Sequence, residues 1–498
     1  MVNMEFYTYL NHKRNMDLPS QIHSFIVKRI YNITFLVKAL LFALFVSLNS
    51  AYAQETTSYN LTNESNAGLL KRAELLIDTD VITSIELSKS LLSQAQSADD
   101  TLLSAKLHNL LGRANKKNNN INESLEHFLQ SSVYYSKLND SRNQIKASIN
   151  YINILLEEKR YDELTTRIET LLPTTLVYGD DFFIAQVLLT KGDSFYEQKK
   201  YNNANAQYTS ALKYLVDEDE LIQRQLGETY KKLAQSYKRL KNREQTAHFY
   251  TKALEVYSNL GDLKLMARTL NTLAEAHRYL DNLVLALDYS TRALEIHKDI
   301  DDPVGFAKAL LGAGIIYRHI NLYEKSLEHI NEAYLYYKKV NNMLGIAKTS
   351  NQMGLVYTRL RQFDQAEFFY QITIDLPKGM VEEKTLASAL REMAVINLES
   401  GDLASAMQYA KKAYITYKNK NLTSYISTTA RIIGNIYRAQ GNNNKAIEYY
   451  KESLSFARET GGKLYEIKSL TALAGILIGI DTNEAISLLK RSLALSPK

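Results

Sequence analysis

The stretch Gln352-Met353-Gly354-Leu355-Val356-Tyr357, followed by Phe363-Asp364-Gln365-Ala366 and then by Tyr370, decides the fold of this chain. A small residue, Gly354, is followed by an aromatic residue after three positions, by a second small residue after twelve and by another aromatic residue after sixteen. A residue without bulk allows a neighbouring backbone to come close, so two small positions mark a place where two helices cross. The stretch therefore predicts a helical hairpin.

The same pattern recurs through most of the chain with a period of forty residues. We call the first small or apolar residue of each unit the marker residue, and successive markers are 40 residues apart eight times and 42 once. A fixed period of this length is the sequence signature of a solenoid of stacked repeats. Turn formers such as Gly401-Asp402-Leu403 stand between the two helices of a unit. The markers are Gly112, Ile152, Gly192, Ala234, Ala274, Gly314, Gly354, Ala394, Gly434 and Ala474, and the second small positions are Ser124, Leu164, Ala204, Thr246, Ala286, Ser326, Ala366, Ala406, Ala446 and, one position early, Ala485.

This pattern resembles the tetratricopeptide repeat, whose small-aromatic-small signature matches Gly354, Tyr357 and Ala366. The resemblance covers about residues 101–498 and ten units. The period exceeds the family's common length of about 34 residues, and forty-residue units are similar to those of kinesin light chains and of bacterial peptide-pheromone receptors. The resemblance implies an all-α, right-handed α-α superhelical solenoid of about ten hairpins. Residues 67–100 carry a further hairpin pattern without a clear pair of small residues, which we interpret as an N-terminal capping hairpin.

Composition supports one repeat architecture rather than several ordinary domains. The 498 residues include 35 tyrosines and no tryptophan, as expected when one aromatic type is reused at equivalent positions. Hydrophobic residues at 45% and charged residues at 23% argue against wholesale disorder and against a multi-span membrane protein. The absence of cysteine excludes disulfides and thiolate sites. A net charge of +6 is small for this length and does not indicate nucleic-acid binding.

The N-terminus predicts an export signal. An apolar run from Ala39 to Leu48 follows the basic residues Lys28, Arg29 and Lys38 and precedes Ala51-Tyr52-Ala53, which resembles a signal-peptidase site. The alternative is a membrane anchor, but even when extended back to Ile33 the apolar segment is short of the roughly 20 residues that a spanning helix needs. We expect a signal peptide over residues 1–53, a polar leader over 54–66 and export to the bacterial periplasm or cell envelope, which fits a chain without cysteine.

A ligand groove is implied by the resemblance, because in this family the first helix of each hairpin lines the concave surface. Residues at i, i+3, i+7 and i+10 share one helix face, which selects the positions six and three before each marker and four after it. Basic residues and asparagines recur there, and these pair with carboxylates and hydrogen-bond peptide backbones, respectively. The candidate ligand-binding residues are Arg268, Asn271, Arg278, Lys308, Arg318, Lys348, Asn351, Arg391, Arg431 and Arg438.

The alternative interpretation is that this basic stripe is an ordinary solvated helix face. Two acidic residues, Asp193 and Glu275, fall one position after their markers on the same face. Ion pairs between neighbouring repeats would then neutralise part of the stripe.

No motif for catalysis or cofactor binding is found. None of the nine histidines forms a His-x-x-x-His or His-Glu-x-x-His pair, and His277 occupies an aromatic repeat position, which predicts a packing role. The glycines of Gly312-Ala313-Gly314 and Thr460-Gly461-Gly462-Lys463 lack the spacing of nucleotide-binding loops. We predict a protein that is not an enzyme, without metal or cofactor.

The sequence therefore predicts a protein-protein interaction scaffold that binds a protein or peptide, with an acidic peptide segment in the concave groove as the favoured ligand. Neither nucleic acid nor a membrane span in the mature chain is expected. The alternative is a periplasmic sensor or input module of a signalling protein of the diguanylate cyclase or histidine kinase type. In that case a membrane helix and an output domain would be encoded beyond Lys498, where the last hairpin lacks a cap.

Overall fold

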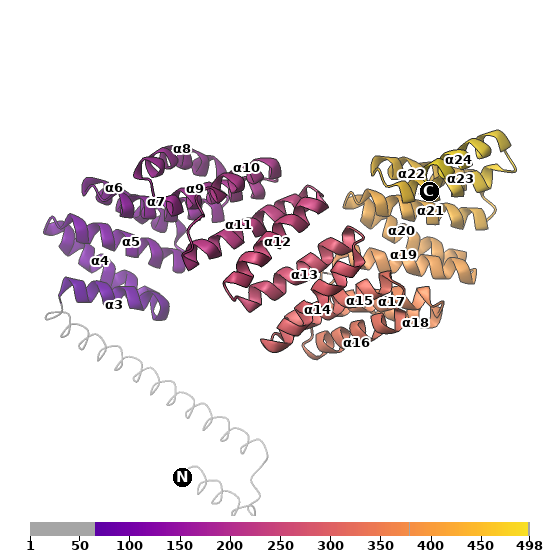
Figure 1. Cartoon of the computed structure of the whole chain (residues 1–498), viewed down its shortest axis with the longest axis horizontal. Helices are drawn as coiled ribbons and strands as arrows, with labels where there is room; N and C mark the ends of the chain where they lie inside the picture. Colours follow the sequence, from indigo (N-terminus) through magenta and orange to yellow (C-terminus); the bar gives the residue numbers. More distant parts are fainter. Residues whose placement is uncertain (1–64, 378, 497–498) are drawn as a thin grey trace, which may run out of the picture. The chain divides into compact units, whose positions relative to one another are not determined.

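The computed structural model describes residues 65–377 and 379–496 of the chain. Within these residues every regular element is an α-helix, and 22 helices pair into successive hairpins (Figure 1). Neighbours in sequence pack on one another throughout each unit of the chain. The predicted all-α solenoid of helical hairpins is confirmed. The predicted signal peptide and most of the polar leader lie outside the described residues.

The helices belong to two compact units that divide between Tyr178 and Gly179. The forty-residue pattern passes this point without a change. The first unit contains α3 (Asn66–Thr79), α4 (Val81–Ser97), α5 (Thr101–Lys117), α6 (Ile121–Lys137), α7 (Ser141–Glu157) and α8 (Tyr161–Tyr178). The second unit contains α9 (Asp181–Glu197), α10 (Tyr201–Leu212), α11 (Glu220–Arg239), α12 (Arg243–Asn259), α13 (Leu263–Tyr279), α14 (Leu283–Asp299), α15 (Pro303–His319), α16 (Tyr323–Lys339), α17 (Met343–Arg359), α18 (Phe363–Asp375), α19 (Glu383–Ser400), α20 (Leu403–Asn419), α21 (Thr423–Ala439), α22 (Asn443–Glu459), α23 (Lys463–Leu477) and α24 (Thr482–Leu495).

The marker residues lie where the two helices of a hairpin cross. A Cβ atom added to Gly354 would lie 2.5 Å from Cε1 of Tyr370, the aromatic residue sixteen positions later, which is fully buried. The glycine is therefore required by the ring that packs against it. Where the marker is Ala394, the residue sixteen positions later is the smaller Ala410. The same close approach of glycine and ring occurs in the pairs Gly192–Tyr208 and Gly434–Tyr450.

Where the second small position is serine, at Ser124 and Ser326, it supplies a hydrogen bond that joins the two helices. Ser326 Oγ donates to the carbonyl oxygen of the marker Gly314 at 2.7 Å. The N-terminal hairpin has the same device, because Ser84 Oγ donates to the carbonyl oxygen of Ala73 at 2.7 Å and both residues are fully buried. The sequence analysis missed this pair, since its spacing is eleven residues rather than twelve. Residues 66–97 are thus an additional unit of the same type.

A second aromatic pair ties five hairpins of the second unit together. The aromatic residue three positions after a marker stacks on the residue fifteen positions after it, as Tyr357 does on Phe369 with ring centroids 5.5 Å apart and planes 3° from parallel. His277 packs on Tyr289 at the equivalent place, with centroids 5.3 Å apart, which fits the packing role predicted for it. The position fifteen residues after the marker was not recognised in the sequence.

The turns between helices repeat every twenty residues, which is half the period seen in the sequence. A residue with positive φ recurs at this interval from Asp99 to Lys199, from Lys241 to Arg361 and from Gly401 to Gly461. At Asn341, for example, the amide of the following residue Asn342 donates to the Tyr337 carbonyl, which closes the end of α16. The Asn342 side chain then caps α17 through the amide of Gly345. One turn geometry therefore serves both the turn within a hairpin and the turn between hairpins.

Two departures from this rule occur in the second unit. The helix α10 ends at Leu212, and the acidic segment Asp217-Glu218-Asp219-Glu220 leads into α11, which explains the single interval of 42 residues. The helix α18 ends at Asp375, four residues earlier than its equivalents, just before Pro377. No helix among the described residues is both long and apolar enough to cross a bilayer.

Candidate functional site

The first helices of the hairpins form the inner layer of the second unit. The helices α13, α15, α17, α19, α21 and α23 contact one another in succession, whereas successive second helices make no comparable contact in the described part of the unit. A stack whose first helices lie closer together than its second helices curves toward the first helices. Figure 1 shows α14, α16 and α18 on the outer side of α13, α15 and α17. The concave face is therefore built from first helices, as the sequence predicted.

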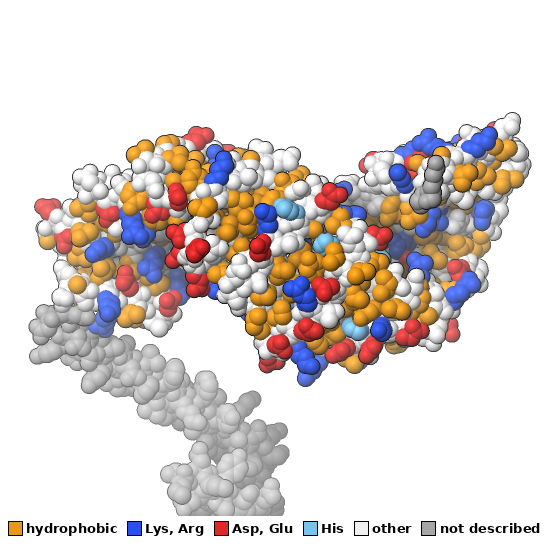
Figure 2. All heavy atoms as spheres, in the orientation of Figure 1, with side chains coloured by type: hydrophobic (Ala, Val, Ile, Leu, Met, Phe, Trp, Pro, Cys, Tyr) orange, Lys and Arg blue, Asp and Glu red, His pale blue; other side chains and the backbone are white. Residues whose placement is uncertain are grey.

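Cationic side chains gather on this concave face. Figure 2 shows Lys and Arg side chains in the hollow between α13 and α21. Burial lowers the pKa of Arg318, and the neighbouring charges of Arg278 and Arg359 lower it further. Burial likewise lowers the pKa of Lys468 on α23, followed by the charges of Arg431 and of Arg359 on α17. Because α17 and α23 are three repeats apart, these cations face one another across the concave surface.

These cations lack carboxylate partners. Among the ion pairs of the described residues, none involves Arg278, Arg318, Arg359, Arg431 or Lys468. Arg318 is half-buried, and its Nε has no hydrogen-bond partner. Burial and the charge of Arg391 also hold the pKa of Arg431 below its usual value. These cations therefore form no ion pair within the described residues, and the charge of Glu392 offsets the lowering of the Arg318 pKa only in part.

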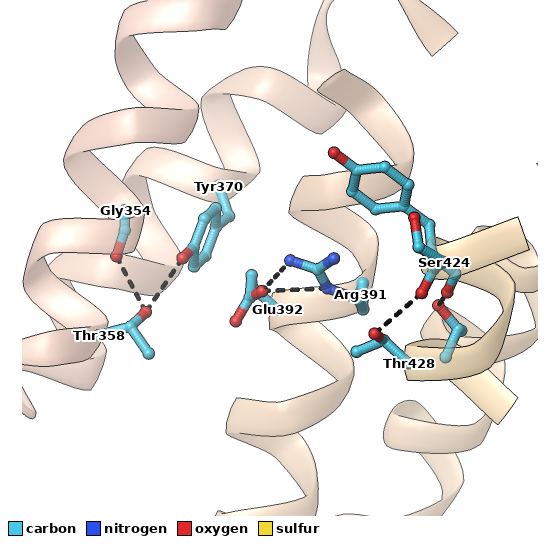
Figure 3. Close-up of polar contacts among 9 residues, drawn as sticks. Gly354, Thr358, Tyr370, Arg391, Glu392, Ser424 and Thr428 are labelled. Atoms are coloured by element: carbon cyan, nitrogen blue, oxygen red, sulfur yellow. Dashed lines mark hydrogen bonds and ion pairs between the residues drawn. The ribbon is translucent and has the colours of Figure 1, made fainter. Parts of the chain in front are cut away.

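Arg391 is the exception among the central arginines. Its Nε donates to Glu392 Oε1 at 3.0 Å, and the two side chains are equally buried, each 15% exposed. Burial alone would lower the pKa of Arg391, but the adjacent Glu392 carboxylate outweighs it and raises that pKa. Figure 3 shows this pair on α19, between Thr358 and Tyr370 on one side and Ser424 and Thr428 of α21 on the other. Glu392 is an acid on this face that the sequence analysis did not select.

The other predicted residues lie at different depths. Arg268 and Lys308 are exposed, and Lys348 forms an ion pair with Glu382 at 2.7 Å. Asn351 is 5% exposed, and its Oδ1 has no hydrogen-bond partner. The remaining three are Arg278, which stacks on Tyr279 at 4.2 Å from the ring centroid, Asn271, whose amide contacts His297, and Arg438, which is exposed.

The two acidic residues that the sequence analysis placed on this face, Asp193 and Glu275, pair with lysines of neighbouring repeats. Lys232 Nζ lies 2.5 Å from Asp193, and Lys238 Nζ lies 2.9 Å from Glu275. Pairing of the predicted kind therefore occurs, and for these two acids it consumes lysines of α11.

A cleft of about 750 Å³ opens at one end of this face. Its walls come from the C-terminal ends of α11 and α13, the start of α12 and Lys384 at the start of α19. Tyr279 is 42% exposed there and lies under the guanidinium of Arg278. The sequence analysis missed Tyr279, Lys384 and also Arg359, because they fall one residue outside the face positions that it sampled or on the helix ends. Among the described residues no cluster of three or more metal-ligating side chains occurs.

Comparison with known proteins identifies the repeats. A family model described as tetratricopeptide repeat matches residues 225–299 and 425–498. These two segments therefore match the tetratricopeptide repeat. No curated protein matches the sequence. Two solved structures share the fold with a TM-score above 0.5, and at 15% identity each shows the fold alone. One is the apo form of RapI, with a TM-score of 0.57 over 72% of this chain and 98% of RapI, and the other is the apo form of the quorum sensor NprR from B. thuringiensis, with a TM-score of 0.52 over 70% of this chain and 98% of NprR.

Proposed function

We propose that the concave face of the second unit binds a peptide segment that carries carboxylates. The observation that supports this most directly is the group of cations around Arg318, which repel one another and form no ion pair among the described residues. A bound carboxylate would form charge-assisted hydrogen bonds with such guanidinium groups and relieve their repulsion. Tetratricopeptide repeats are usually non-catalytic, and we propose binding without a chemical step.

An extended segment fits the spacing of the face. Helices in contact lie about 8–10 Å apart, so α13, α15 and α17 together span roughly 16–20 Å between the first and last axes. An extended chain advances about 3.3 Å per residue, so roughly six residues would cross this distance. Asn271 and Asn351 stand at equivalent positions of α13 and α17, three residues before their markers. Asn271 is partly exposed and offers its amide to such a segment, whereas Asn351 is buried.

The proposal is tested with a defined probe, the fluorescein-labelled hexapeptide Glu-Ala-Glu-Ala-Glu-Ala, and the same peptide with Gln in place of Glu. Fluorescence anisotropy with the full chain should show binding of the acidic probe and at least tenfold weaker binding of the neutral one. Binding of the acidic probe should fall at least tenfold in the double variant Arg318→Gln and Arg359→Gln. The affinity of the wild type should also decrease as salt is raised.

A matched control removes the same charge from the outer layer. Lys411 and Lys412 are exposed on the second helix α20, and replacing both by Gln should leave the affinity unchanged. Equal weakening by the control and the concave variant would mean that net charge rather than the concave face attracts the probe. Equal binding of the acidic and neutral probes would reject the carboxylate as the recognised group.

We also propose that the chain is exported to the cell envelope. The support is the apolar run Ala39–Leu48 with basic residues before it and Ala51-Tyr52-Ala53 after it. N-terminal sequencing of the protein recovered from an envelope fraction should begin at Gln54. Recovery of the intact N-terminus from the cytoplasm would contradict export.

A further inference from the structure

One repeat of the second unit has a histidine where its neighbours have tyrosine. The position 23 residues after the marker is Tyr257, Tyr337 and Tyr417 in three repeats of this unit, and it is His297 in the repeat of marker Ala274. His297 is fully buried, at 0% exposure. Gly305 makes room for its ring, because a Cβ atom there would lie 2.2 Å from the imidazole. Tyrosine fills the equivalent space in the neighbouring repeats, so packing alone does not explain the histidine. Its polar contacts are the remaining difference.

The two ring nitrogens of His297 face two different groups. Nε2 lies 3.0 Å from Nδ2 of Asn271, and Nδ1 lies 3.1 Å from Oδ2 of Asp302. The other oxygen of Asp302 accepts from the amide of Gly305 at 3.0 Å and so caps α15, which fixes the carboxylate in place. Asp302 thus lies at ion-pair distance from Nδ1 without hydrogen-bond geometry, and Nε2 contacts Asn271, so the three residues adjoin one another from the start of α15 to the concave face of α13.

The surroundings define which nitrogen carries the proton. A carboxylate beside Nδ1 favours the tautomer protonated there, which leaves the Nε2 lone pair free to accept from the Asn271 amide. Burial lowers the pKa of His297, the carboxylate of Asp302 opposes this, and the cations Arg268 and Lys308 lower the pKa again. The ring is therefore neutral at pH 7. An Asn271 whose Nδ2 donates one hydrogen to His297 is held in one orientation, so its acceptor Oδ1 has a fixed place on the concave face, beside the second N–H of the same amide.

We infer that Asn271 is a fixed hydrogen-bond acceptor for a backbone N–H group of an extended peptide, and that His297 and Asp302 are positioning residues that set its orientation. This inference rests on the proposed function and adds a contact to the main chain of the ligand. An asparagine free to turn would present either its donor or its acceptor. A fixed acceptor selects one register of the peptide, because backbone N–H groups on one edge of an extended chain recur only at every second residue.

The test combines variants of the full chain with N-methylated probes. The acidic hexapeptide used above is compared with six analogues, each methylated at one backbone nitrogen, which removes one N–H donor. With the wild type, methylation at one position in particular should weaken binding roughly fivefold or more. In the variants His297→Phe and Asn271→Ala, the penalty at that position should fall below twofold, while the penalties at the other positions persist.

The variant Tyr337→Phe is the matched control. It alters the equivalent ring of the next repeat, which has Leu311 rather than Asn at the position three residues before its marker, and it should keep the wild-type pattern of penalties. A penalty pattern that is the same in wild type, His297→Phe and Asn271→Ala would overturn the inference, as would the absence of any penalty in the wild type. Failure of the wild type to bind the unmodified acidic probe would instead refute the proposed function. Asn271→Ala leaves the buried ring in place, so the comparison does not depend on how well His297→Phe folds.

Discussion

At the scale of single residues, the fold depends on pairs of complementary size. The marker and the residue sixteen positions later share one space, so a glycine accompanies tyrosine in the repeat of Gly354 and Tyr370, and an alanine accompanies alanine in that of Ala394 and Ala410. The volume of the pair is adjusted within each hairpin, because protein interiors are packed as densely as organic crystals.

Gly354→Ala should therefore destabilise the protein, although alanine is the better helix former. The new Cβ would lie 2.5 Å from the ring of Tyr370, which is fully buried and cannot move aside freely. We expect the free energy of unfolding, measured with urea, to fall by about 1–3 kcal/mol. Gly312→Ala is the control in a neighbouring first helix, because the nearest atom, Ser290 Oγ, would be 4.0 Å from its Cβ. That variant should instead gain up to about 1 kcal/mol from helix propensity alone, and a loss in both would contradict the packing explanation.

At the scale of helices, uniform turns keep the repeats in register. The residue with positive φ is glycine, asparagine or aspartate at most turns, but it is a lysine or an arginine at four of them, Lys159, Lys199, Lys241 and Arg361. A side chain with a Cβ atom pays for the left-handed conformation, by about 1 kcal/mol for ordinary residues. These turns are therefore places where the sequence is not optimal for the fold.

Arg361→Gly should raise stability for this reason. Arg361 has a φ of 58° and is exposed, with no ion pair among the described residues, so its removal loses no contact. Relief of the left-handed conformation should raise the free energy of unfolding by about 0.5–1 kcal/mol. The greater conformational entropy of glycine in the unfolded chain offsets part of this gain. The reverse change at the equivalent turn, Gly441→Arg, should lower it by a similar amount. If both changes left the urea midpoint unaltered, backbone strain at these turns would be negligible.

At the scale of the whole chain, the sequence predicts the repeats but not the contacts between distant repeats. The repeat and its hairpins followed from the spacing of small and aromatic residues, because those features are local, and the inner position of the first helices followed from the resemblance to tetratricopeptide repeats. Two residues of the site were missed for the opposite reason. Arg359 and Lys384 become neighbours of the site only through the curvature of the stack, and spacing within one helix carries no information about contacts between helices several repeats apart. Glu392 was missed for a different reason. Its partner is the adjacent Arg391, and the search considered only residues at helical spacing.

The final prediction concerns the balance between stability and binding in the second unit as a whole. Arg359 lowers the pKa values of both Arg318 and Lys468, so it repels cations on its own side and across the concave face. Arg359→Gln should therefore raise the free energy of unfolding by about 0.5 kcal/mol at low salt, a small value because Arg359 is exposed and its field is partly screened. The gain should vanish in about 1 M salt, where screening acts within about 3 Å.

Arg391→Gln is the matched variant on the same face, with the opposite expectation. It removes the partner of Glu392, which is 15% exposed, and leaves that carboxylate with no ion pair among the described residues. We expect a loss of stability of about 1–3 kcal/mol, in contrast to the gain for Arg359→Gln. Opposite signs for the two changes would show that Arg359 is maintained against the stability of the free protein, as expected of a residue that serves a ligand. Destabilisation by both would instead mean that the cations around Arg318 are neutralised in solution, and the case for a carboxylate ligand would lose its basis.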